Sequence, residues 1–380
     1  MFNRHLRKWL GVPKSFSSIG LYSTSSKLQL PLSSITEEFK VTKTRQVMML
    51  RDSKDDKVKE ANVDVRTGRK WVQPLWQSAD ARHRRELVKQ EVRRGEEDRQ
   101  VRAVSMKQQG QYMKWEMARP RKISWHEMWR MDGQKISFLL RSVYDVLPTP
   151  TNLTMWKLIE DPSCKFCGKP ANLEHVLSSC RTALKDGRYT WRHDQVLREI
   201  AAVLDTHRRK KTKIEKGPKF INFIKGGGES SRNTYSKASG IIATANDWEM
   251  QADVGGKTTF PREILITTLR PDIVLWSRIS RQVILVELTV PWETRLEEAH
   301  ERKLAKYQEL VTDIQEKNWR TWYFPVEVGC RGFVSQTFWR ALGSLGLTGP
   351  VRRSLVGKVG RQAEEASGWV WRKREEQWKS

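Results

Sequence analysis

The chain has 380 residues, of which 70 are Lys or Arg and 44 are Asp or Glu, and its formal net charge is +26. An excess of this size favours a polyanionic partner, nucleic acid above all. No run of about eighteen apolar residues occurs, which excludes a transmembrane helix and a membrane partner on sequence grounds. We therefore expect a soluble protein of the nucleus or cytoplasm, with two or three domains.

The first segment, residues 1–52, contains no acidic residue before Glu37 and carries several basic residues among many serines. That composition is typical of a mitochondrial transit peptide. We reject this interpretation and expect residues 1–52 to be a folded segment.

Residues 53–135 are predicted to form a basic linker and helical arm. The stretch from Ala81 to Ala118 is highly charged and compatible with a helix, with Gly95 and Gly110 as weak points. Its arginines predict contact with nucleic acid, and the alternative is a solvated helix whose glutamates pair with them.

The chain contains 17 tryptophans. Trp115, Trp125 and Trp129 lie among arginines and lysines, so base stacking is one interpretation. Packing in a core is the other.

Residues 136–200 contain three of the four cysteines and one histidine in the spacing C-x2-C-x7-H-x4-C, namely Cys164, Cys167, His175 and Cys180. Thiolate and imidazole ligands in this number suit a tetrahedral zinc ion, and four protein ligands leave no position for water. The pattern predicts a structural zinc knuckle, with reduced core cysteines as the alternative. Cys330 is expected to be a packed thiol, and His193 to have a structural or backbone-contact role rather than to bind metal or act as a base. We expect a reducing compartment.

Residues 201–235 are predicted to be a basic, flexible linker. The run His207 to Lys213 is interpreted as a nuclear localisation signal, a phosphate contact or a plain connection. The run Gly226 to Gly228 is expected to be flexible rather than a phosphate-binding loop.

Two short apolar runs in residues 236–348, Asp272 to Trp276 and Val283 to Val290, are predicted to form a hairpin. The symmetry of this hairpin places Asp272 opposite Glu287, with Cβ atoms about 5 Å apart. Both carboxylates could then hold one divalent cation, magnesium or manganese. Strand alternation turns Glu287 away from Ile284, Val286 and Leu288, so it lies either in a site or on a solvated face.

A helix without Gly or Pro is predicted from Thr294 to Asn318, and Lys303, Lys306 and Tyr307 share one face of it. Two acids beside a lysine suit metal-assisted hydrolysis of a phosphodiester, because carboxylates fix the cation and an ammonium group orients water or stabilises developing charge.

The order of elements in residues 236–348 predicts an α/β domain with a central mixed sheet. A short helix is expected near 236–246 and further strands near 247–254 and 321–328. Asp247, Glu249 and Asp253 are candidates for a third acid. Residues 349–380 are a charged tail.

Pro271-Asp272 followed by Glu287 resembles the PD-(D/E)XK motif of restriction-like nucleases. The usual strand lysine is replaced by Thr289. In site-specific non-LTR (LINE-type) retrotransposon polyproteins the lysine comes from the following helix, a place that Lys303 or Lys306 matches. The segments similar to that family are Glu287 to Glu293, Lys303 to Tyr307 and Pro325 to Gly332.

The segments around the knuckle, Leu147 to Leu153 and Gly187 to Asp194, are also similar to these polyproteins. In residues 1–52, the segments Arg7 to Pro13, Ser17 to Tyr22 and Leu30 to Ser34 resemble the thumb of their reverse transcriptases. The pair Asp55-Asp56 lies in a polar run, unlike palm aspartates on an apolar hairpin, so we do not expect polymerase activity.

The resemblance implies a multi-domain α+β protein with a helical thumb-like N-terminus, a zinc knuckle and a restriction-like endonuclease. It implies a DNA target and retrotransposon RNA as partners. The implied catalytic residues are Asp272, Glu287, Lys303, Lys306 and Tyr307. A catalytically inactive nucleic-acid-binding remnant is the alternative.

Overall fold

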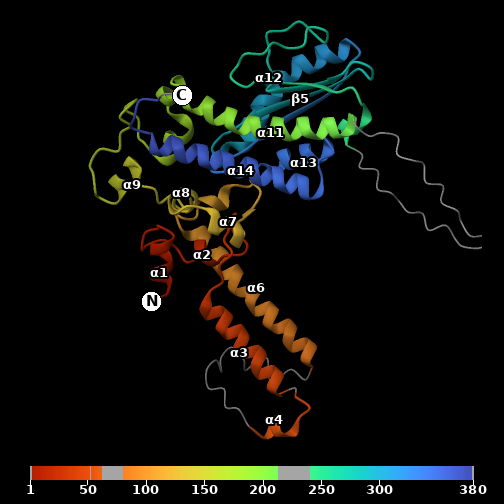
Figure 1. Ribbon diagram of the computed structural model, residues 1–380. Coiled ribbons are helices and arrows are strands. Elements are labelled where there is room, and N and C mark those ends of the chain that lie inside the picture. Colours follow the sequence, from red (N-terminus) through yellow and green to blue (C-terminus); the bar gives the residue numbers. More distant parts are fainter. Residues whose placement is uncertain (1, 52, 62–79, 213–239, 379–380) are drawn as a thin grey trace, which may run out of the picture. The chain divides into compact units, whose positions relative to one another are not determined.

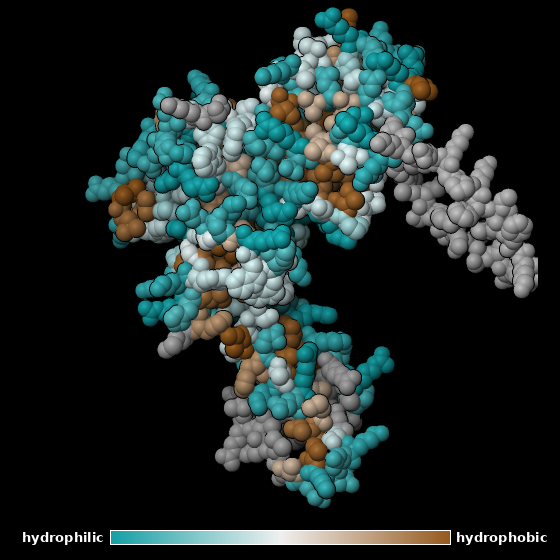
Figure 2. Space-filling model, viewed as in Figure 1, coloured by the Kyte–Doolittle hydropathy of each residue, from teal (hydrophilic) through white to brown (hydrophobic). Residues whose placement is uncertain are grey.

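The computed structural model describes residues 2–51, 53–61, 80–212 and 240–378 (Figure 1). The chain divides into two compact units, the first formed by Met1–Lys114 with Pro120–Val146 and the second by Trp115–Arg119 with Leu147–Ser380. Among the described helices, none has the length and apolarity needed to cross a membrane. The glycine-rich part of the predicted linker lies outside the described residues. The visible surface is largely hydrophilic, with small hydrophobic patches (Figure 2).

The first unit is mainly helical, and its two short strands pair in parallel. Its core contains three aromatic rings, in which Tyr144 meets Phe16 at 4.9 Å and Tyr112 at 5.0 Å between ring centroids. The elements are α1 (Phe2–Trp9), α2 (Ile19–Tyr22), β1 (Leu28–Gln29), α3 (Ile35–Arg51), α4 (Asp56–Glu60), α6 (Ala81–Ser105), η1 (Gln111–Lys114), β2 (Arg121–Lys122), α7 (Trp125–Arg130) and α8 (Gly133–Val143).

The predicted helix of residues 81–118 is confirmed for its first part, as α6, which begins with Asp80 accepting a hydrogen bond from the Arg82 N–H and ends at Ser105. Glu96 of α6 pairs with Arg99 at 2.6 Å, and Arg99 also pairs with Glu37 of α3. At Arg99, therefore, the structure agrees with the alternative in which arginines of this helix pair with glutamates.

The second unit contains a mixed sheet together with most of the longer helices. Its elements are α9 (Pro150–Met155), η2 (His175–Ser179), α10 (Arg181–Lys185), α11 (Arg188–Thr212), η3 (Ile241–Thr244), β3 (Glu249–Ala252), β4 (Ile273–Ser277), β5 (Gln282–Thr289), η4 (Glu293–Arg295), α12 (Leu296–Glu316), β6 (Arg320–Glu327), α13 (Gln336–Ser344) and α14 (Gly349–Arg372).

The sheet has the strand order β3-β4-β5-β6, antiparallel except for the parallel pair β5-β6. The mixed sheet predicted from the sequence is confirmed, and β3 to β6 and α12 begin and end within two residues of the predicted bounds. Helices α12 and α11 lie on opposite faces of the sheet (Figure 1). Both faces of β5 are therefore buried, as in sheets covered by helices on two sides.

One face of the hairpin packs against α12. Val274 and Leu285 are opposed in the ladder, and both belong to a buried cluster with Tyr307 of α12. Asp272 and Glu287 are the next opposed pair when the register is continued, and side chains two residues apart in a strand share a face. Glu287 consequently lies on the face that α12 covers, whereas Asp272 lies just before β4 and its carboxylate contacts His193 of α11. The solvated-face alternative for Glu287 is wrong, because the residue is only 3% exposed.

A buried ion pair stabilises the turn after β6. Glu293 accepts hydrogen bonds of 2.6 Å from both the backbone N–H and the Nε of Arg331. The Arg331 guanidinium lies 3.6 Å from the ring centroid of Trp292 and 4.0 Å from that of Trp115. Trp115 is therefore 1% exposed, and the base-stacking interpretation is wrong for this tryptophan.

Replacing Glu293 with glutamine is expected to lower the free energy of unfolding by about 3–5 kcal/mol, because it leaves the Arg331 charge buried without a counter-ion. Urea denaturation followed by tryptophan fluorescence measures this loss. The matched control is Glu376→Gln, whose exposed pair with Lys373 should contribute about 0.5 kcal/mol or less. Equal losses in the two variants would contradict the prediction.

Candidate metal centre and candidate nuclease site

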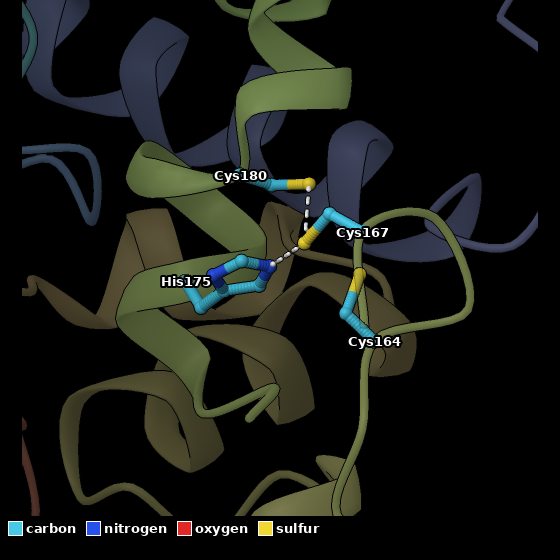
Figure 3. A group of neighbouring side chains, drawn as sticks. All are labelled: Cys164, Cys167, His175 and Cys180. Carbon is cyan, nitrogen blue, oxygen red and sulfur yellow. Dashed lines mark hydrogen bonds between the residues drawn. The ribbon is translucent and has the colours of Figure 1, made fainter. Parts of the chain in front are cut away.

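The predicted knuckle residues converge in the second unit (Figure 3). One ligand atom from each of four residues lies within 4.8 Å of the other three, and these residues are Cys164, Cys167, His175 and Cys180. Among the described residues, these four are the group of three or more Cys, His, Asp or Glu side chains placed to hold a metal ion. Cys330 lies elsewhere, fully buried. Burial and the neighbouring Glu293 raise the pKa of its thiol, which agrees with a packed thiol rather than a nucleophile.

The donor set fits a tetrahedral ion. Two sulfurs at about 2.3 Å from a common metal stand about 3.8 Å apart at the tetrahedral angle, and the Sγ atoms of Cys167 and Cys180 are 3.8 Å apart. The Nε2 of His175 lies 3.2 Å from the Cys167 Sγ. Burial, and next the charge of Lys169, lower the pKa of His175. This favours the neutral imidazole that a metal ligand requires.

Local backbone geometry explains the placement of these ligands. The first two cysteines lie in a tight turn in which Gly168 has a φ of +69° and donates its N–H to the Cys164 carbonyl at 2.9 Å. His175 begins η2, and its N–H donates to the Asn172 side chain at 2.8 Å. The Tyr189 hydroxyl of α11 donates to the carbonyls of His175 and Val176 at 3.1 and 2.9 Å. The knuckle is thus fixed to α11.

The nuclease-motif residues also converge. The backbone N–H of Asp272 donates to Glu287 Oε2 at 3.2 Å, and the N–H of Leu288 donates to Asp272 Oδ2 at 2.6 Å. The ammonium of Lys303 donates to Glu287 Oε1. The predicted approach of a helix lysine to the acids is confirmed for Lys303 and Glu287.

Electrostatics at this site favour a cation. Burial, and next the charge of Asp272, raise the pKa of Glu287, whereas Lys303 and Lys306 lower it. Two carboxylates that repel each other in a buried position gain stability from a positive charge between them. In this structure the Lys303 ammonium supplies such a charge at Glu287.

Lys306 and Tyr307 lie beside Lys303 on α12, and burial together with the charge and hydrogen bond of Glu287 raises the pKa of the Tyr307 hydroxyl. Lys306 is exposed, and its ammonium donates to the Tyr307 hydroxyl at 3.2 Å. The ring of Tyr307 is buried in the core cluster, and its hydroxyl donates to the Arg270 carbonyl at 3.1 Å. Tyr307 thus fixes the backbone that leads into Asp272, which makes it a positioning residue.

Of the three candidates for a further acid, Asp253 is the one near the pair. Its backbone N–H donates to the Asp272 carbonyl at 2.8 Å, and its carboxylate accepts from the Thr258 N–H at 2.8 Å. Asp247 instead accepts from Ser277 and Ile279 at the hairpin turn. Glu249 pairs with Arg278 at 3.3 Å.

His193 is expected to have a structural or backbone-contact role, and its Nε2 does lie 3.3 Å from the Leu288 carbonyl; its imidazole also contacts the acids. Its Nε2 lies 3.2 Å from Asp272 Oδ2, and its Nδ1 lies 3.2 Å from Asp194 Oδ1. Burial lowers its pKa, but the hydrogen bonds with Asp194 and Asp272 outweigh burial and raise the pKa to about 10. The imidazolium is then charged at neutral pH. A sequence signal existed in the His193-Asp194 pair, but its partner Asp272 lies far along the chain.

Arg192, which the sequence did not single out, joins the knuckle to the sheet. Its guanidinium donates to the Leu177 carbonyl at 2.7 Å and to the Val290 carbonyl at 3.1 Å. It also donates to the Ser367 hydroxyl of α14 at 3.1 Å. One buried side chain therefore binds η2, the end of β5 and α14.

A cavity of about 450 Å³ lies beside the acids, between the knuckle and α12. Ser178 of η2, His193 of α11 and Thr289 of β5 line it together with Arg302 and Lys303 of α12. Thr289, at the place of the usual strand lysine, faces the same cavity as Lys303. Its basic side chains suit a phosphate-bearing ligand, and apolar residues such as Leu288, Val290 and Trp292 line the rest of the cavity.

No family model matches the chain, and no curated protein shows significant similarity to it.

Proposed function

We propose that the chain is a metal-dependent DNA endonuclease of the PD-(D/E)XK type, which nicks target DNA in the manner of site-specific non-LTR retrotransposon polyproteins. The observation that carries this proposal is the contact of the Lys303 ammonium with Glu287, on the strand opposite Asp272. Lys303 of the helix thereby lies near the place of the usual strand lysine, which is Thr289 in this chain. The protein is proposed to act in the nucleus or cytoplasm, on a DNA target and with retrotransposon RNA as a further partner.

In this proposal Asp272 and Glu287 hold magnesium or manganese, which supplies Lewis-acid activation of the scissile phosphate. Lys303 orients the attacking water or stabilises charge on the phosphate oxygens. His193 holds the Asp272 carboxylate in place through its Nε2, and Tyr307 holds the Arg270 carbonyl just before it. The reaction adds water across one P–O bond and leaves the other strand intact.

The Cys164, Cys167, His175 and Cys180 cluster is proposed to hold one structural zinc ion. Its role is to fix η2 against α11, so that the knuckle forms one wall of the cavity beside the acids. A closed four-ligand site has no open position for a substrate.

A plasmid-nicking assay tests the nuclease proposal. The full chain with magnesium or manganese should convert supercoiled DNA to the open circle, and Asp272→Asn and Glu287→Gln should each remove this activity. The matched control is Glu309→Gln, at an exposed position on α12. It should nick at the wild-type rate. If the wild-type chain did not nick DNA with either ion, the nuclease proposal would be wrong. The chain would then be the inactive nucleic-acid-binding remnant, an alternative that Thr289 favours.

Nucleic-acid binding is expected to survive loss of the nuclease acids. Contacts between basic side chains and phosphates release counter-ions, so the association constant should fall by about 1,000-fold or more between about 50 mM and about 200 mM salt. Asp272→Ala should bind with wild-type affinity at each salt concentration, because base-independent phosphate contacts dominate. Fluorescence anisotropy with a labelled duplex measures both. Binding that is insensitive to salt would assign the +26 charge to another partner.

A further inference from the structure

Three tryptophans, two from α7 and one from α1, form one exposed aromatic surface on the first unit. The rings of Trp125 and Trp129 are stacked, with centroids 6.3 Å apart and an interplanar angle of 26°. The ring of Trp9 meets that of Trp129 at 5.8 Å. We call Trp9, Trp125 and Trp129 the tryptophan cluster.

The cluster is a product of local helix geometry and one tertiary contact. Trp125 and Trp129 are four residues apart on α7, so they share a face, and Ser124 fixes the start of that helix by accepting from the Glu127 N–H at 3.1 Å. Trp9 ends α1, and the chain after it turns at Gly11, whose carbonyl accepts from the Ser137 hydroxyl of α8 at 2.8 Å. This contact fixes the end of α1 within the same unit.

The rings are open to solvent to a degree that core packing does not explain. Trp129 is 70% exposed, Trp9 50% and Trp125 49%. Large aromatic side chains are mostly buried in folded proteins, and several exposed together indicate a binding surface. The contrast with the fully buried Trp115 shows that these three rings are not part of the core.

The charges around the cluster identify the partner. Helix α1 contains no acidic residue and carries exposed Arg4 and Lys8. Lys122, which precedes α7, and Arg130, its last residue, are also exposed, as is one acid, Asp132, just after the helix. The acid of α7, Glu127, is paired with Arg121 at 3.2 Å. Aromatic faces bordered by cations complement a chain of bases and phosphates. They do not complement an apolar peptide that has few acidic residues.

We propose that the tryptophan cluster is a stacking platform for the bases of single-stranded nucleic acid, with the neighbouring lysines and arginines contacting its phosphates. Bases of a single strand are free to stack on an indole face, whereas those of a duplex are already stacked on each other. Every base has an aromatic face, so the platform should tolerate any sequence. This site goes beyond the proposed nicking activity and does not depend on it.

Binding of a fluorescein-labelled 15-nucleotide oligothymidine by the full chain tests the platform. The measurement uses the Asp272→Asn background without added magnesium, so that a failure of the nuclease proposal has no influence on it. Trp129→Ala should weaken binding about 5- to 100-fold, the range expected for loss of one stacked base, and Trp129→Phe should restore most of it. The matched control is Trp369→Ala, an exposed tryptophan on α14, which should leave the affinity unchanged.

A second measurement compares single-stranded with duplex DNA. Trp125→Ala with Trp129→Ala should reduce affinity for the single strand much more than affinity for a duplex of equal length. Equal reductions for both, or unchanged affinity for the single strand, would overturn the proposal. So would a wild-type dimer in sedimentation that becomes a monomer in the double variant, since the cluster would then be an interface between copies of the chain. Because all three rings are exposed, thermal unfolding of the variants should match that of the wild type.

Discussion

Removal of the metal from the Cys164, Cys167, His175 and Cys180 cluster is expected to unfold the knuckle. The binding free energy of a structural zinc ion is folding free energy, on the order of 10–16 kcal/mol in small zinc domains, and the segment from Cys164 to Cys180 contains little regular structure apart from η2. A chelator should therefore expose this segment to proteolysis and lower the melting temperature of the chain. Limited proteolysis with mass spectrometry and a thermal scan measure both effects.

Metal analysis provides the control for this prediction. The wild-type chain and Cys330→Ala should each carry one zinc ion, and X-ray absorption should place sulfur at about 2.3 Å from it. Cys167→Ser should lose the ion. A zinc content that falls in Cys330→Ala but not in Cys167→Ser would contradict the assignment of the ligands.

Replacement of Lys303 by alanine is expected to lower the rate of metal-dependent nicking by about 100- to 1,000-fold. Loss of one preorganised group that stabilises developing charge typically has an effect of this size. DNA binding should remain close to wild type, because phosphate contacts elsewhere dominate affinity. Lys303→Ala combined with Lys306→Ala should abolish nicking. Single-turnover cleavage of a supercoiled plasmid measures the rate.

The matched control for Lys303 is Lys317→Ala, an exposed lysine at the end of the same helix. It removes one positive charge without touching the acids and should nick at the wild-type rate. If both variants lost activity to the same degree, the loss would reflect net charge rather than a role at the site. Unchanged nicking by Lys303→Ala would remove Lys303 from the proposed mechanism.

The register of the hairpin could be predicted because it depends on local symmetry. Two β-branched runs around a short polar turn have one natural pairing, and the predicted opposition of Asp272 and Glu287 follows the ladder that joins Ile273 to Val286. The knuckle was predictable for a related reason, since its ligands lie within a short segment whose spacing suits one ion. Helix α12 was predictable from its length without Gly or Pro.

Contacts between distant segments were not predictable. His193 and Asp272 meet at 3.2 Å only because tertiary packing brings α11 to the end of β5, where His193 also lies 3.3 Å from the Leu288 carbonyl. Trp115 was placed among candidates for base stacking because its neighbours in sequence are charged, yet Arg331 and Phe333 bury it. Glu287 was open to two interpretations because strand alternation separates the two faces of a strand but does not reveal which of them a helix covers.

The sequence by itself determined the strands of the sheet, helix α12, the hairpin register and the four knuckle ligands, because periodicity and spacing act over short distances along the chain. It did not predict helix α14, since residues 349–380 were expected to be a charged tail, whereas residues 349–372 form this partly buried helix. Only the tertiary structure decided that Glu287 is buried against Lys303, that His193 holds Asp272, and that Trp9 joins Trp125 and Trp129 at the surface. Each of these depends on which faces of separate helices pack together, and side-chain packing between distant segments leaves no regular pattern in a single sequence.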